Sequence, residues 1–214
     1  AWEQLYALHV DSGEQLLAAR SAAMVAMYLM IDTGLMAPIR GWLRRADLLI
    51  ADLGETPVHA VVAMVRTYER LWCGDMATAA ANATRAVDLG ERMGVVPAVL
   101  VGRTAIARLR IFDGQIDEGV EMLDDIALTL MSGDVDPMTS GMVYCEVICA
   151  VQGLALYERA AEWTHAMKHW RHRAAFGGFR GRCRVHSAEM LRLAGPCDEA
   201  EQEALEDCEE LRPW

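Results

Sequence analysis

The sequence predicts an all-α protein, a right-handed α-solenoid of about five antiparallel helix pairs that forms a single domain over residues 1–214. The abundance of Ala, Leu, Met, Arg and Glu favours helix over strand when it is summed over long windows. Glycines recur every twenty residues, and every second segment repeats with a period of forty. Such a period is typical of stacked helix pairs, whereas it would be accidental in the alternative, a single globular bundle.

The glycine spacing predicts where the helices end. Gly34, Gly54, Gly74, Gly94 and Gly114 are each twenty residues apart. Glycine just past a helix accepts the left-handed conformation that ends helices, so this spacing indicates helices of roughly fifteen to eighteen residues joined by short turns. Prolines follow several of these glycines by three or four residues, near first helical turns where a missing N–H costs nothing.

In chain order, the five helix pairs are expected to begin near residues 13, 56, 97, 137 and 179. The stretches GDMATAAANA at 74–83 and GPCDEAEQEA at 195–204 open a second helix with small residues, which let paired helices approach closely. LYERAAEWTHA at 156–166 has the same phase but lacks the glycine. A period of forty also admits HEAT-like pairs, but the turn Gly-Asp-x-x-x-Ala favours a tetratricopeptide-like repeat.

Composition limits the classes of function. The net charge of −11 and the pI near 5.0 oppose attraction to nucleic acid, so no direct nucleic-acid binding is expected. The most apolar run, AAMVAMYLMI at 22–31, is too short to cross a membrane. Six cysteines without the spacing of a secreted scaffold indicate a reduced, cytoplasmic chain. The absence of an initiator Met and the end at LRPW suggest a fragment of a longer protein.

The stretch WTHAMKHWRHR at 163–173 contains the residues with most chemical potential. Helical periodicity places Trp163 and Trp170 on one side, and we predict that both are structural. His165, His169 and His172 lie on the other side, as a solvated polar face. The alternative is a metal-binding helical protein or enzyme that uses a cluster from two successive helices: His165, His169, Cys183 and His186. A zinc site needs three or four convergent ligands, so we predict no metal.

Charge is segregated near the C-terminal end. Six cations and no acid lie between Lys168 and Arg184, and eight acids lie between Asp198 and Glu210. A basic stretch with Trp and Phe is found in some RNA-binding segments, but the acidic stretch complements it directly. We expect the two stretches to pair within the chain or across an interface.

No motif predicts catalysis. The chain lacks a phosphate-binding loop, a G-x-S-x-G turn and an H-E-x-x-H helix. Its paired carboxylates, such as Asp124 and Asp125, are adjacent in sequence and therefore splay around a helix. We predict a protein that is not an enzyme and that needs no cofactor.

A groove is predicted on the first helices of the pairs, which line the concave surface of tetratricopeptide-like arrays. Aligning the pairs on their turn glycines brings four residues to one equivalent inward position: Tyr28, Tyr68, Arg108 and Tyr144. Tyrosine and arginine are residue types favoured in recognition, so these four are the candidate partner or ligand contacts. The alternative is that they are partly buried core residues with polar tips at the surface.

From residue 138 onward, a series of motifs occurs in a characteristic order: GMVYCEVI, RAAEWTHAMKHW, FRGRCRVHSAEMLRLAG and DEAEQEA. This part resembles the tetratricopeptide-like region of actinobacterial LuxR-type, broadly MalT-like, multidomain transcriptional regulators, and the rest of the chain resembles it only in repeat pattern. The resemblance implies a non-catalytic module of a transcriptional regulator that binds a protein or peptide or senses a small-molecule effector. Trp163, Trp170, Gly181 and the segment 182–186 fit the family pattern.

The family also carries a nucleotide-binding domain and a helix-turn-helix, and neither a Walker motif nor a helix-turn-helix occurs in this sequence. If the chain is part of a longer solenoid, its terminal pairs expose apolar faces. We therefore expect a homodimer formed through those ends.

Overall fold

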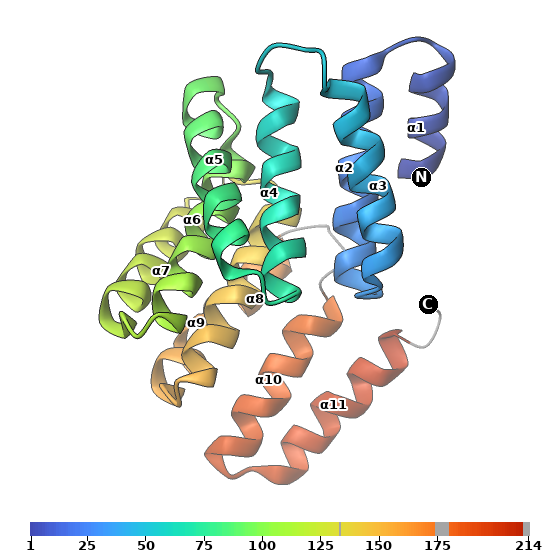
Figure 1. The fold of residues 1–214 in the computed structure, drawn as a ribbon. Coiled ribbons are helices and arrows are strands. Elements are labelled where there is room, and N and C mark those ends of the chain that lie inside the picture. The colour runs from blue at the N-terminus through green and yellow to red at the C-terminus, as the bar shows by residue number, and fades with distance from the viewer. Residues whose placement is uncertain (133, 174–179, 212–214) are drawn as a thin grey trace. The chain divides into compact units, whose positions relative to one another are not determined.

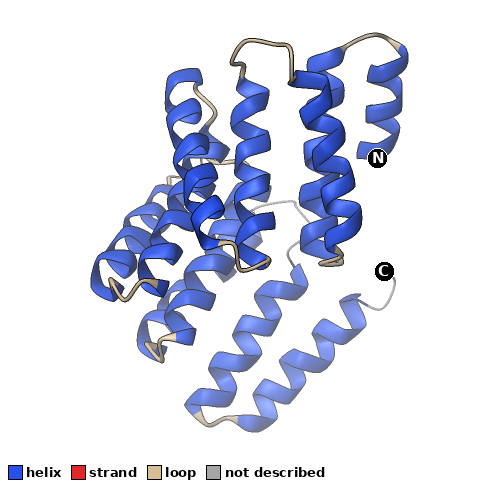
Figure 2. Cartoon of the chain, in the orientation of Figure 1, coloured by secondary structure: helices blue, strands red, loops and turns tan. Residues whose placement is uncertain are grey.

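The computed structural model describes residues 1–132, 134–173 and 180–211, without the side chains of residues 171–173, 180–184, 207, 210 and 211. All regular structure in these ranges is helical (Figure 2). The helices are α1 (Trp2–Asp11), α2 (Gln15–Asp32), α3 (Met36–Ile50), α4 (Pro57–Trp72), α5 (Met76–Met93), α6 (Val96–Phe112), α7 (Ile116–Leu130), α8 (Pro137–Gly153), α9 (Tyr157–Arg173), α10 (Arg180–Ala194) and α11 (Cys197–Leu211). Within these ranges no helix is both long and apolar enough to span a bilayer.

The prediction of an all-α fold built from helix pairs is confirmed. The first helices of the five pairs, α2, α4, α6, α8 and α10, begin at residues 15, 57, 96, 137 and 180, each within two residues of the predicted positions. Helix α1 precedes the first pair and was not anticipated. Three of the predicted first helices have a proline in the first helical turn: Pro57 of α4, Pro97 of α6 and Pro137 of α8.

The helices form two compact units, Ala1–Leu109 and Arg110–Trp214, and α6 crosses the division. In the first unit α2 packs against α1, α3 and α4, and α4 packs against α5 (Figure 1). In the second unit α8 packs against α7 and α9, and α10 packs against α9 and α11. The expectation of one continuous domain stays a prediction.

Side-chain caps and glycines set the helix boundaries. The Asp75 carboxylate accepts a hydrogen bond from the Thr78 amide at 3.2 Å, and Asp136 accepts one from the Thr139 amide at 3.0 Å. Hydrogen bonds from Thr78 hold the pKa of Asp75 below its usual range. At the turns inside four of the five pairs, a glycine has the predicted positive φ: Gly34, Gly74, Gly114 and Gly195.

The first helices α2, α4 and α8 each pack against helices on several sides, and small residues make this possible. Five alanines of α2 are fully buried: Ala18, Ala19, Ala22, Ala23 and Ala26. Between α5 and α6 the backbones approach so closely that a Cβ on Gly102 would lie 2.9 Å from Val87 Cγ2 and 3.1 Å from the Ala83 carbonyl oxygen. Real Cβ atoms rarely approach a backbone oxygen that closely, so this contact requires glycine.

We predict that Gly102→Ala destabilises the protein by about 1 kcal/mol, because overpacking against Ala83 and Val87 outweighs the gain in helix propensity. Gly41→Ala is the matched control, since Gly41 lies in α3 with nothing within 4 Å of a built Cβ. There the propensity gain acts alone, and stability should rise by up to about 1 kcal/mol. Urea unfolding of both variants checks the opposite signs. Stabilisation by Gly102→Ala would show that the two helices separate at low cost.

A buried carboxylate ties α3 to α4 in the first unit. Glu69 of α4 has a side-chain exposure of 0%, and one of its oxygens accepts a hydrogen bond from Arg40 Nε at 2.7 Å. The other oxygen lies 3.0 Å from Arg70 Nε. A buried carboxylate is tolerated only when it is paired, so Glu69 fixes how the start of α3 meets the end of α4.

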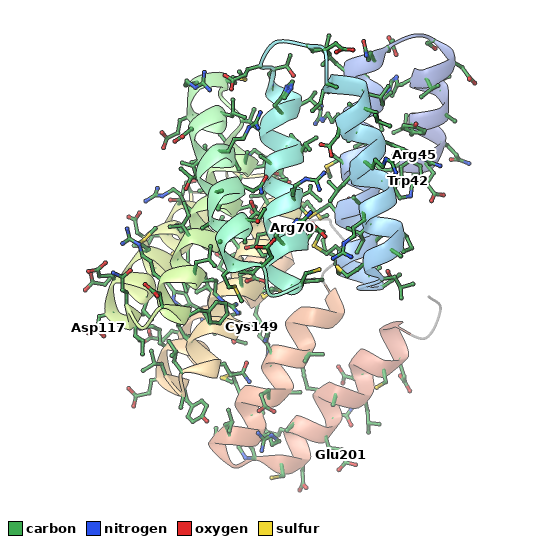
Figure 3. All side chains as sticks on the ribbon, in the orientation of Figure 1. Trp42, Arg45, Arg70, Asp117, Cys149 and Glu201 are labelled. Atoms are coloured by element: carbon green, nitrogen blue, oxygen red, sulfur yellow. The ribbon has the colours of Figure 1, made fainter. Side chains whose placement is uncertain are left out.

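Aromatic contacts attach α1, which contributes no buried residue of its own. The Tyr6 ring of α1 meets the Trp42 ring of α3 edge to face, with centroids 5.0 Å apart. The Arg45 guanidinium of α3 lies 5.7 Å from the Tyr6 ring centroid and 4.4 Å from the Trp42 ring centroid. Figure 3 shows the Trp42 and Arg45 side chains together on α3. Edge-to-face rings and a stacked guanidinium therefore hold this terminal helix at the surface.

The turn between α8 and α9 departs from the glycine pattern. Ala155 occupies the place that glycine takes in the other four pairs, and its φ is +58°. An alanine in this conformation places its Cβ too near the following carbonyl oxygen, which glycine avoids. The missing glycine noted in LYERAAEWTHA thus leaves backbone strain at this turn.

We predict that Ala155→Gly raises the free energy of unfolding by about 0.5 to 1 kcal/mol, because the left-handed conformation costs glycine nothing. Gly114→Ala makes the reverse change at the equivalent turn, where φ is +86° and a built Cβ meets nothing within 4 Å. That variant should be destabilised by a similar amount. Thermal and urea unfolding provide the comparison, and equal stability of all three proteins would contradict the prediction.

Candidate interaction groove between α7 and α9

The groove lies in the second unit, between the second helices of two successive pairs. Asp124, near the middle of α7, accepts a hydrogen bond from Trp163 Nε1 of α9 at 2.8 Å. The other Asp124 oxygen lies 3.0 Å from Arg159 Nη1. One carboxylate therefore holds the two helices side by side. A hollow lies on each side of this contact, and Glu162 lines both hollows.

The first hollow, which we call the acidic hollow, has a volume of about 910 Å³. It lies between the start of α7, the turn after α8 and the start of α9. Its apolar lining consists of Ile116, Val120, Leu154, Ala155, Leu156 and Tyr157. Four acids surround this lining: Asp117, Glu121, Glu158 and Glu162. All four are exposed, and in the part of the chain that the structure describes none of them forms an ion pair.

The second hollow, which we call the aromatic hollow, has a volume of about 520 Å³. It is bounded by the end of α7, the start of α8 and the second half of α9. The Tyr144 and Trp170 rings lie in its lining with centroids 5.8 Å apart and an interplanar angle of 44°. His165 and His169 also line it, one helical turn apart with ring centroids separated by 4.6 Å.

The predicted division of WTHAMKHWRHR into two faces is seen in α9. His165 and His169 are exposed, whereas Trp163 and Trp170 are half-buried in contacts with α7 and α8. Both tryptophans therefore make structural contacts, although neither lies in the fully buried core. The side chain of His172 lies outside the described residues.

The structure gives no support to a metal centre in the residues it describes. Among their side chains, no three His, Cys, Asp or Glu residues converge on one point. His186 is buried on α10, with 8% exposure, and the Cys183 side chain lies outside the described residues. His165 and His169 thus supply two ligands, fewer than the three or four that a zinc site requires.

The predicted groove on the first helices is corrected at two of its four positions. Tyr68 and Tyr144 are 1% and 2% exposed, so neither presents its polar end to solvent as a partner contact would require. They lie on α4 and α8, which neighbouring helices enclose, and burial raises the pKa of Tyr144. Tyr28 and Arg108 are half-exposed. Their role as partner contacts stays a prediction.

The predicted pairing of the basic and acidic stretches is observed at one position. Lys168 Nζ of α9 lies 3.8 Å from Glu203 Oε1 of α11. The side chains of the other five cations, Arg171, Arg173, Arg180, Arg182 and Arg184, lie outside the described residues. At the one described position, the basic and acidic stretches therefore pair within the chain.

The acidic hollow was not predicted, although the sequence contains a signal for it. Asp117 and Glu121 are one helical turn apart on α7, and Glu158 and Glu162 have the same spacing on α9. The two acid pairs occupy the same phase of the repeat, forty-one residues apart. Equal phase on neighbouring second helices brings the acids to one side, and Figure 3 shows Asp117 projecting outward from α7.

No protein-family model and no curated protein matches the chain. Two crystal structures of a Podosopora anserina protein, described as a kinesin light chain with nearly identical TPR-like repeats, are similar to it. The first, of a single-substitution variant, gives a TM-score of 0.57 at 14% identity and covers 89% of this chain and 93% of that one. The second gives 0.55 at 17% identity and covers 90% and 94%. The chain therefore has the fold of a tetratricopeptide-like helical repeat protein.

We predict that Trp163→Phe costs about 1 kcal/mol of stability, because it keeps most of the ring but removes the N–H that Asp124 accepts. Trp170→Phe is the matched control, since the Trp170 contact is ring packing on Tyr144, and it should cost less. Trp163→Ala should cost about 2 kcal/mol through lost burial of a half-buried ring. A double-mutant cycle of Trp163→Phe with Asp124→Ala measures the bond directly. A coupling energy near zero would show that the bond does not hold α7 against α9.

Proposed function

We propose that this chain is a non-catalytic protein-interaction module that binds a protein or peptide segment in the groove between α7 and α9. The observation that carries the proposal is the exposed apolar surface in the acidic hollow. Ile116 is 42% exposed, Leu156 39% and Tyr157 46%, within one concave site. Apolar and aromatic side chains gathered in a hollow and surrounded by polar groups are typical of binding sites.

The fold supports this proposal. In this chain the first helices α2, α4 and α8 carry many buried residues, and the surface between the second helices α7 and α9 is open. A partner segment can bind there without rearranging the core. Tetratricopeptide-like repeats usually act as scaffolds rather than enzymes. The Asp124 contacts with Arg159 and Trp163 fix the spacing of α7 and α9, so the site is largely formed before a partner binds.

We further propose that the module belongs to a cytoplasmic transcriptional regulator. This context rests on the resemblance of the motifs after residue 138 to LuxR-type regulators. A small-molecule effector is part of the proposal on the same basis. A homodimer is part of it because the terminal helix pairs are expected to expose apolar faces. Tyr28 and Arg108, both half-exposed, are the proposed contacts of a second binding surface in the first unit.

The proposal predicts that selection of a random peptide-display library on the folded chain yields peptides with saturable, micromolar binding that denatured protein lacks. Leu156→Ala should weaken the selected peptides about fivefold to tenfold, since it removes apolar contact area in the hollow. Leu128→Ala is the matched control, because Leu128 lies on α7 outside both hollows and is 59% exposed. Calorimetric titration measures both variants.

Two results would count against the interaction module. One is a library that yields no peptide with preference for the folded chain. The other is equal binding by the Leu156 and Leu128 variants, which would place the binding surface away from the α7/α9 groove.

A further inference from the structure

We infer that the acidic hollow binds a Lys- and Arg-rich amphipathic peptide segment of another protein. This inference rests on the proposed function and adds the chemistry of the partner. It is drawn from two features of the hollow, the balance of its charges and its apolar lining, and from the net charge of the whole chain.

The charge balance of the hollow favours a cationic partner. Among the described residues that line it, four are carboxylates and one, Arg159, is a cation. Arg159 is already paired with Asp124, a residue outside the lining, at 3.0 Å. The four acids have no ion-pair partner in the described part of the chain. A bound Lys or Arg side chain would therefore meet carboxylates that need not first break a contact within the protein.

The apolar lining of the hollow favours a ligand that has apolar groups as well as positive charges. Leu156 and Tyr157 line the same hollow as the four acids, so a ligand that reaches the carboxylates also covers apolar surface. Lysine and arginine can bury their aliphatic stems on such a surface while their charged ends stay at the rim. Bulky apolar residues beside them would fill the space over Val120 and Leu154. A free metal ion or a small cation would leave this surface exposed.

The charge of the whole chain favours a different protein over a second copy of this one. The chain has a net charge of −11, so electrostatic attraction does not draw a second copy to the acidic hollow. The same charge attracts a basic segment and orients its approach. Rim charges exposed to solvent act mainly on association and on salt dependence, so binding should weaken as salt is added.

The direct test uses labelled synthetic peptides and the full chain. The basic probe repeats Lys-Leu-Arg-Leu, and a matched acidic probe repeats Glu-Leu-Asp-Leu. Fluorescence anisotropy should show the basic probe binding at least about tenfold more tightly than the acidic one, with an affinity that falls as salt is raised.

Neutralising three of the four acids of the acidic hollow distinguishes binding at this site from general attraction to an acidic protein. The rim variant combines Asp117→Asn, Glu121→Gln and Glu158→Gln. It should bind the basic probe about tenfold more weakly, and that binding should depend less on salt. The matched control removes the same charge from α11 through Asp198→Asn, Glu199→Gln and Glu201→Gln. These three residues are exposed, and Figure 3 shows Glu201 on α11. The control triple should change the affinity less than about twofold.

Several outcomes would overturn the inference. Equal weakening by the two triple variants would mean that the probe responds only to net charge. An unchanged affinity in Leu156→Ala would mean that the apolar lining is not covered. Self-association of the chain that the rim variant abolishes would identify a second copy as the occupant.

The peptide-display selection distinguishes failure of this inference from failure of the proposed function. Selected peptides that are basic and apolar, and that lose affinity for the rim variant, would support both. Neutral or acidic peptides that depend on Leu156 would leave the interaction module standing and overturn the basic partner. If the folded chain selects no peptide and does not bind the basic probe, both ideas fail.

Discussion

The first helix of each pair can be buried only if neighbouring helices approach it closely, and the rest of the structure depends on this constraint. In α2 five fully buried alanines allow this close approach. Between α5 and α6 Gly102 allows it, because Gly102 lies against Ala83 and Val87. A larger residue at such a position would separate the helices and expose the apolar face that stabilises the stack. The close packing of these helices therefore depends on small residues at the contact positions.

Enclosure of the first helices decides where binding surfaces can lie. Tyr68 and Tyr144 belong to enclosed helices, so their rings contribute to packing. The second helices pack less completely against each other, and between α7 and α9 the side chains leave two hollows. The same close packing that stabilises the pairs thus supplies a rigid support for an open groove beside them.

Two carboxylates with different surroundings fix the relation between neighbouring pairs. Glu69 is fully buried and is paired with Arg40 and Arg70, so loss of either cation would leave a costly buried charge. Asp124 is partly exposed, at 29%, and joins α7 to α9 through Trp163 and Arg159. Asp124 also pairs with Arg159, the one cation among the described residues that line the acidic hollow. The four acids of that hollow therefore have no ion-pair partner in the described part of the chain.

The sequence by itself determined the fold class and the position of every helix pair. Glycine and proline act through local backbone geometry, so their spacing placed the starts of α2, α4, α6, α8 and α10 within two residues. It also placed the tryptophans and the histidines of α9 on different faces, because helical periodicity is a local property.

Only the tertiary structure decided which polar residues reach solvent and which meet. Tyr28 and Tyr68 have similar positions in the repeat, yet Tyr28 is half-exposed and Tyr68 is 1% exposed, because burial depends on the helices packed around each one. The acids of α7 and α9 are forty-one residues apart in sequence. They surround one hollow because the Asp124 contacts hold the two helices side by side, and a contact between distant segments cannot be derived from local spacing alone.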